Sequence, residues 1–190
     1  LIHLEMPELK ALSDEEVRER IHLIDDQRLF VIAEAFRRGV TIYEVHDITK
    51  IDKWFLQKVM NIVEMENRIK TEPMTAELML AAKKKGFADV TIAGYIGKTW
   101  QEVREMRKGW GIIPTYKMVD TCAGEFKAET PYFYSTYDDE NEAEEFIERQ
   151  HSDKKKIIVF GSGPIRIGQG IEFDYCSVHL SLIHISEPTR

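Results

Sequence analysis

The sequence has little of what marks several specialised protein classes. Its 190 residues include only two cysteines, Cys122 and Cys176, which lie too far apart to suggest a disulfide framework. No apolar run approaches the roughly 20 residues that cross a bilayer. Glu5, Glu8 and Lys10 interrupt any signal-peptide pattern at the start. We therefore expect a cytoplasmic protein with reduced thiols and no membrane partner.

Basic residues are fewer than acidic ones. There are 26 lysines and arginines against 33 aspartates and glutamates, and the formal net charge is −7. This balance argues against nonspecific binding to nucleic acid, because such binding depends on neutralising phosphates. Seven acids and no base occupy residues 138–148. We interpret them as a solvated helix face rather than a metal site, since metal ligands converge from different elements. No metal site is predicted.

Helix start signals are abundant in the first two thirds of the chain. Ser13 with Glu16 and Thr99 with Glu102 have the spacing of capping boxes, in which side chain and backbone satisfy each other's hydrogen bonds. Apolar residues at helical spacing follow these and other caps. The pattern predicts helices that begin near residues 13, 26, 41, 52, 75, 88 and 99. We expect the large aromatic residues of this part to lie in the core, namely Trp54, Phe55, Trp100 and Trp110.

The pattern changes after Ile112. Pro114, Pro131 and a run of aromatic residues predict an extended connector over residues 112–137. An acidic helix should follow over about residues 140–150. The mainly α part thus ends in a connector and a helix before a different kind of domain begins.

That second domain begins with a buried strand and a glycine loop. Residues 154–160 end in four apolar residues, typical of a buried strand. The loop glycines that follow are Gly161, Gly163, Gly168 and Gly170. Strand, loop and helix open a doubly wound, Rossmann-like α/β fold. The loop either holds an anion at a helix N-terminus or forms a tight turn that binds nothing. Arg166 stands where a dinucleotide motif has its third glycine, and we favour an ion pair over an anion site for it.

Six collinear segments resemble one known family. The glycine loop, residues 161–175, resembles the start of the second synthetase half of the carbamoyl-phosphate synthase large chain. The other segments resemble the helical oligomerisation domain between the two halves and the connection that follows it. They are residues 28–39, 51–56, 85–89, 116–126 and 132–137. The common order makes the resemblance specific.

The resemblance implies a domain division. Residues 1–153 would form the helical oligomerisation domain, including the connector and the acidic helix. Residues 154–180 would start the α/β domain that precedes an ATP-grasp fold. Residues 181–190 depart from the family, and Pro188 opposes the helix expected there, so we interpret them as a non-native tail.

The resemblance also implies a function. The family makes carbamoyl phosphate from bicarbonate, glutamine-derived ammonia and two ATP, with magnesium, for arginine and pyrimidine synthesis. Its large chain works with a small glutaminase subunit and with other large-chain copies. ATP and magnesium would bind outside this segment, which should hold no catalytic residue and be inactive alone. The residues by themselves also allow a non-enzymatic helical interaction module with a truncated nucleotide-binding appendage.

Glu172 is the one residue for which the resemblance suggests a role. The family passes unstable intermediates through an internal passage, and a carboxylate just after the glycine loop could line or gate it. The alternative is that Glu172 and Asp174 only stabilise the start of a helix, because carboxylates interact favourably with the helix dipole there.

Overall fold

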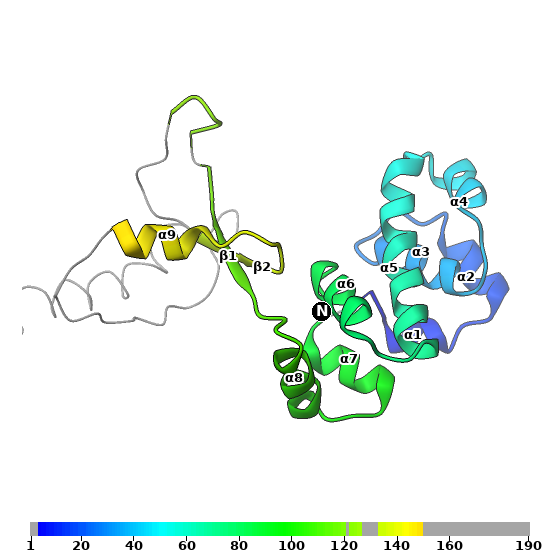
Figure 1. Cartoon of the computed structure of the whole chain (residues 1–190). Coiled ribbons are helices and arrows are strands. Elements are labelled where there is room, and N and C mark those ends of the chain that lie inside the picture. The colour runs from blue at the N-terminus through cyan, green and yellow to red at the C-terminus, as the bar shows by residue number, and fades with distance from the viewer. Residues whose placement is uncertain (1–3, 121, 127–132, 150–190) are drawn as a thin grey trace, which may run out of the picture. The chain divides into compact units, whose positions relative to one another are not determined.

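The computed structural model describes residues 4–120, 122–126 and 133–149 (Figure 1). The chain divides into two compact units, residues 1–147 and 148–190. Almost everything described belongs to the first unit. The predicted strand and glycine loop at residues 154–176 lie outside the described residues.

Eight helices occupy the described part up to Gly109 and confirm the helical prediction. They are α1 (Pro7–Lys10), α2 (Asp14–Arg20), α3 (Arg28–Arg37), α4 (Ile42–Thr49), α5 (Lys53–Thr71), α6 (Ala76–Lys84), α7 (Asp89–Ile96) and α8 (Trp100–Gly109). Ser13 and Thr99 form the capping boxes predicted for them, and Thr41 forms a third with Glu44. The one-turn helix α1 was not predicted, because its four residues show no helical periodicity.

The helices enclose two apolar cores that share α5. The first core gathers buried side chains from α1 to α4, such as Leu9 and Phe36, with Leu56 and Val63 of α5. The second core begins at Met65 on the same helix and continues through α6, α7 and α8. Because α5 is 19 residues long, its first part packs in one core and its last part in the other.

The prediction that the large aromatic residues lie in the core is wrong. Trp54 and Phe55 are each 60% exposed, and Trp100 and Trp110 are also exposed. Trp54, Phe55 and Trp100 lie in the first turn of a helix, and Trp110 follows the last turn of α8. Helical spacing identifies a face but not how far along that face the core extends, so residues at the helix ends escape burial.

The connector is a two-stranded antiparallel ribbon. Strand β1 (Thr115–Met118) pairs with β2 (Phe133–Thr136), and Thr115 lies opposite Thr136 in the register. The acidic helix α9 (Glu142–Arg149) follows, in agreement with the prediction. The Phe133 ring of β2 lies edge-on to the ring of Phe146 in α9, with 5.5 Å between centroids. No helix within the described ranges is long and apolar enough to cross a membrane.

Candidate functional sites in the helical part

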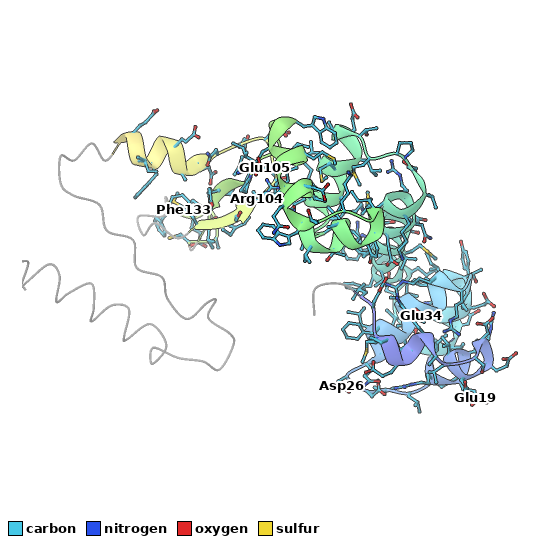
Figure 2. The ribbon with its side chains drawn as sticks, turned by 90° about the horizontal axis from the view of Figure 1, so that it is seen from below. Glu19, Asp26, Glu34, Arg104, Glu105 and Phe133 are labelled. Atoms are coloured by element: carbon cyan, nitrogen blue, oxygen red, sulfur yellow. The ribbon has the colours of Figure 1, made fainter. Side chains whose placement is uncertain are left out.

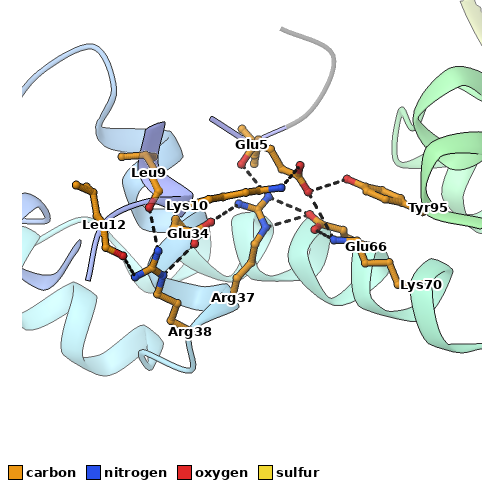
Figure 3. Close-up of polar contacts among 11 residues, drawn as sticks. Glu5, Leu9, Lys10, Leu12, Glu34, Arg37, Arg38, Glu66, Lys70 and Tyr95 are labelled. Carbon is orange, nitrogen blue, oxygen red and sulfur yellow. Dashed lines mark hydrogen bonds and ion pairs between the residues drawn. The ribbon is translucent and has the colours of Figure 1, made fainter. Parts of the chain in front are cut away.

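A buried carboxylate marks the boundary between the two cores. Glu66 of α5 is only 1% exposed. Arg37 of α3 donates to its Oε2 from Nε at 3.1 Å and from Nη2 at 2.9 Å, and Lys70 donates to its Oε1 (Figure 3). Arg37 also donates from Nη2 to the backbone carbonyl of Leu4 at 2.7 Å. One guanidinium therefore joins α3, α5 and the segment before α1.

Glu5 extends this group to α7. It accepts hydrogen bonds from Lys10 Nζ at 2.8 Å and from the Tyr95 hydroxyl at 3.1 Å, and Lys70 Nζ lies 3.6 Å away. Burial alone would raise the pKa of Glu5, but the hydrogen bond from Lys10 and the charges of Lys10 and Lys70 lower it to about 2. Burial, together with the charges of Glu66 and Glu5, raises the pKa of Tyr95. Glu5 is therefore held ionised and Tyr95 protonated at neutral pH.

Arg38 secures the first two helices on α3. Its Nη2 and Nη1 donate to the carbonyls of Leu9 and Leu12 at 2.9 and 2.8 Å, which lie at the end of α1 and just beyond it. Its Nε donates to Glu34 at 2.9 Å. Glu34 is buried, and in Figure 2 it lies among the helices, whereas Asp26 lies at the periphery. We call Glu5, Glu34, Arg37, Arg38, Glu66, Lys70 and Tyr95 together the entry cluster.

A second group of charges lies at the edge of the second core. Lys83 of α6 donates to Asp89 Oδ1 at 2.8 Å and to the carbonyl of Phe87 at 2.8 Å. Arg107 of α8 contacts Asp89 Oδ2 from Nε and Nη2, each at 3.1 Å, and donates to the carbonyl of Ile112 at 2.8 Å. Burial would raise the pKa of Asp89, but Lys83 and then Arg107 lower it. We call Lys83, Asp89, Arg107 and Tyr137 the exit cluster.

Tyr137 completes the exit cluster from the connector. Lys83 Nζ lies 5.1 Å and the guanidinium carbon of Arg107 lies 5.6 Å from the centroid of its ring. Both distances are within the range of a cation–π interaction. The same ring packs against the second core. It is the point at which the chain leaving the ribbon meets α6 and α8.

In contrast to these buried charges, a group of aromatic side chains is exposed to solvent and forms an aromatic surface. It consists of Tyr43 of α4 and of Trp54 and Phe55 of α5, of which Tyr43 is 67% exposed. The Trp54 and Phe55 rings form a T-shaped pair at 5.0 Å. Lys53 lies 4.5 Å from the Tyr43 ring and Lys58 lies 4.8 Å from the Trp54 ring.

A groove of about 340 Å³ adjoins Tyr43. Apolar side chains from α3, α4 and α5 line much of it, including Phe36, Ile42 and Met60, with Glu64 as the charged member. Aromatic residues beside an apolar hollow are typical of protein interfaces rather than of catalytic centres.

The residues that the sequence singled out as candidate sites are not among these groups. Arg166, Glu172 and the loop glycines Gly161, Gly163, Gly168 and Gly170 lie outside the described residues. Over residues 4–120, 122–126 and 133–149, no three histidines, cysteines or acids are grouped as metal ligands. The structure therefore leaves the glycine-loop predictions untested.

The comparisons with known proteins agree with the order of the parts. Residues 2–111 match the family model of the carbamoyl-phosphate synthetase large chain, oligomerisation domain. Residues 153–186 match the carbamoyl phosphate synthase preATP-grasp domain. The chain belongs to the carbamoyl-phosphate synthase large-chain family. The resemblance inferred from the residues is thereby confirmed.

Two curated relatives show how much of a large chain is present. A carbamoyl phosphate synthase large chain of Lachnoclostridium phytofermentans is 57% identical over 168 residues, which are 88% of this chain and 15% of the relative. That of Agathobacter rectalis is 52% identical over 169 residues, which are 89% of this chain and 15% of the relative. The chain thus spans about 15% of the length of these relatives.

Sequence reasoning missed both ion clusters. Glu66 stands at a helical spacing with the apolar residues Val59, Ile62 and Ile69. A charged residue on an apolar row is the available signal, because burial there requires partners. Arg37 lies 29 residues from Glu66 in the sequence, and Glu5 lies further away. Only the fold brings these residues together.

Proposed function

We propose that this chain is a scaffold segment of a glutamine-hydrolysing carbamoyl-phosphate synthase large chain. The observation that carries the proposal is the order of the two family matches, the oligomerisation domain followed by the preATP-grasp domain. The parent enzyme would be a carbon–nitrogen ligase that makes carbamoyl phosphate from bicarbonate, ammonia and two ATP for arginine and pyrimidine synthesis. It would work in the cytoplasm with a small glutaminase subunit.

The geometry supports a scaffold role. The charges of both clusters are engaged with opposite charges and backbone carbonyls, and they join helices to one another. ATP and magnesium would bind to parts of the large chain outside this segment. The segment would connect the two synthetase halves.

A chimera tests the proposal directly. The 168 aligned residues would replace their counterpart in the Lachnoclostridium phytofermentans large chain, which shares 57% of them. We expect the chimera to form carbamoyl phosphate from glutamine, bicarbonate and ATP. The unmodified relative and a chimera carrying an unrelated helical domain of equal length are the controls. A chimera that folds but makes no product would contradict the proposal and favour an independent helical interaction module.

We further propose that the aromatic surface contacts a second copy of the chain. The family model that covers this part is described as an oligomerisation domain. A two-fold contact pairs a patch with itself, and this one holds both charge signs, because Lys53 and Lys58 lie over the Tyr43 and Trp54 rings and Glu64 lines the adjoining groove. Trp54 and Phe55 would be the anchors, since exposed aromatic residues dominate interface energetics.

The mass of the chimera in solution tests this surface. Replacing Trp54 and Phe55 by alanine should lower the mass from oligomer towards monomer, whereas Trp110→Ala, also an exposed tryptophan, should not. An unchanged mass would overturn the assignment of the surface. If the mass is unchanged but activity falls, another part of the same large chain covers the aromatic residues, and the scaffold role itself survives.

For Glu172 we propose a role in coupling rather than in chemistry. If this carboxylate lines an internal passage, Glu172→Gln in the chimera should keep the partial ATP reactions and reduce carbamoyl-phosphate formation. The ratio of ATP hydrolysed to product formed would then rise. Glu172→Gln with an unchanged ratio and normal yield would mean that the residue only stabilises a helix start, which is worth about 0.3–1 kcal/mol.

A further inference from the structure

The ring of Tyr137 has an unusual setting for a residue in a connector. It follows directly on β2 and lies against both Lys83 and Arg107. Lys83 is 9% exposed and Arg107 is 8% exposed, so both cations lie largely out of water. A cation–π interaction gains strength when the cation is desolvated.

Asp89 makes this arrangement possible. Two buried cations on one ring would repel each other, but Asp89 binds both, Lys83 at 2.8 Å and Arg107 at 3.1 Å. Lys83 and Arg107 are held further by the carbonyls of Phe87 and Ile112. The helical part therefore fixes the two cations in place independently of Tyr137. Together they form a preformed binding surface for its ring.

The ribbon is supported by α9, where Phe133 meets Phe146 and the Met118 N–H donates to Glu142, but the described contacts that hold it on the helical part are sparse. It has two strands of four residues each, and the rings of Tyr116 and Tyr134 are exposed. Beyond Tyr137, the described contacts of the ribbon region with α6 include the surface pair Lys84–Asp139 at 3.6 Å, in which Asp139 is almost fully exposed. Such exposed pairs contribute little.

We propose that Tyr137 is a latch. Its ring, seated on Lys83 and Arg107, holds the connector on the helical part, and its release opens residues 133–141 without unfolding the helices. The chain that leaves the ribbon is thereby fixed to α6 and α8 at one residue. This role goes beyond the proposed function and does not depend on it, because it concerns only contacts within the chain.

Hydrogen exchange followed by mass spectrometry on the full chain tests the latch. Tyr137→Leu removes the ring, Tyr137→Phe keeps it and removes only the hydroxyl, and Tyr134→Leu makes the same change on an exposed ring of the preceding strand β2. We expect Tyr137→Leu to accelerate exchange in residues 115–118 and 133–136 by roughly thirtyfold, the scale of a desolvated cation–π contact. Tyr137→Phe and Tyr134→Leu should stay close to the unmodified chain.

The same data contain the results that would overturn the latch. Unchanged ribbon exchange in Tyr137→Leu would show that something else holds the connector. Equal acceleration in α6, α7 and α8 would show that Tyr137 is an ordinary core residue. Tyr137→Phe behaving like Tyr137→Leu would show that the hydroxyl matters rather than the ring. Lys83→Met keeps most of the side-chain volume and should reproduce the opening of the ribbon in part. If it does not, the contact between Lys83 and the Tyr137 ring does not hold the connector.

Discussion

At the scale of single residues, the charges inside the helical part explain more of its organisation than its aromatic residues do. Glu66 lies where the two cores meet and is bound from α3 by Arg37 and from its own helix by Lys70. Removing one partner of a buried ion pair leaves a charge without compensation, which costs far more than losing an exposed pair. The two kinds of pair can be compared on this one helix.

Glu66→Gln should lower the free energy of unfolding by about 3 kcal/mol, the lower end for a broken buried pair, because Arg37 keeps its charge in a largely buried position with Glu34 as its remaining carboxylate partner. Chemical denaturation monitored by circular dichroism measures the change. Glu72→Gln breaks the exposed pair with Arg68 on the same helix and should leave the denaturation midpoint unchanged. A Glu66→Gln midpoint equal to that of Glu72→Gln would refute a structural role for the cluster.

The pH dependence of stability should contain a contribution from Glu5. Its pKa is lowered from 4.5 to about 2 in the folded chain, so its stabilising effect is fully present above about pH 4.5. The effect is lost as the pH falls from there towards 2, because the unfolded chain then binds the proton first. Glu5→Gln should flatten the stability curve in this window and leave its shape above pH 6 unchanged. Denaturation series at several pH values check this, and an equally steep acid limb in Glu5→Gln would contradict it.

At the scale of elements, the sequence predicts where helices begin better than what they bury. Capping boxes at Ser13 and Thr99 are local signals, and both are present as predicted. The short helix α1 and the pairing of β1 with β2 were not predicted, since four-residue elements carry too little periodicity. The exposure of Trp54 was also missed, because it depends on where the cores end. The ion clusters were not predicted either, because residues that are distant in sequence form them.

Two glycines at helices should respond to alanine with opposite signs. Gly86 ends α6 with φ of +86°, a left-handed conformation that costs alanine about 1–2 kcal/mol although no atom lies within 4 Å of the new methyl group. Gly94 lies inside α7 with open space around it, and alanine there should stabilise by about 0.5–1 kcal/mol. Thermal unfolding of both variants measures the two signs. Two shifts in the same direction would contradict the conformational explanation.

At the scale of the whole molecule, the chain combines a helical part that matches the oligomerisation domain with a segment that matches another domain of the same family. The family match to the preATP-grasp domain covers only residues 153–186, outside the described residues. One strand and one helix cannot close a core of their own. We therefore expect the activity of the family to require the rest of a large chain.

The purified chain should not hydrolyse ATP. The buried charges Glu66 and Lys83 are paired within ion clusters, and the chain spans 15% of its large-chain relatives. A coupled assay for released phosphate measures turnover. ATP hydrolysis that a single substitution within this chain abolishes would place a catalytic site in it and contradict the scaffold role.

We propose that the helical part folds by itself as a scaffold, with the entry cluster joining α3, α5 and α7 and the exit cluster joining α6, α7 and α8. Hydrogen exchange on residues 1–141, which keep both clusters, tests it most directly against the full chain. We predict that α3, α5 and α7 keep the same protection in both, because their cores and ion pairs lie within these residues. Loss of protection of α3 in the shortened chain, with strong protection of residues 156–160 in the full chain, would show that the helical part does not fold by itself.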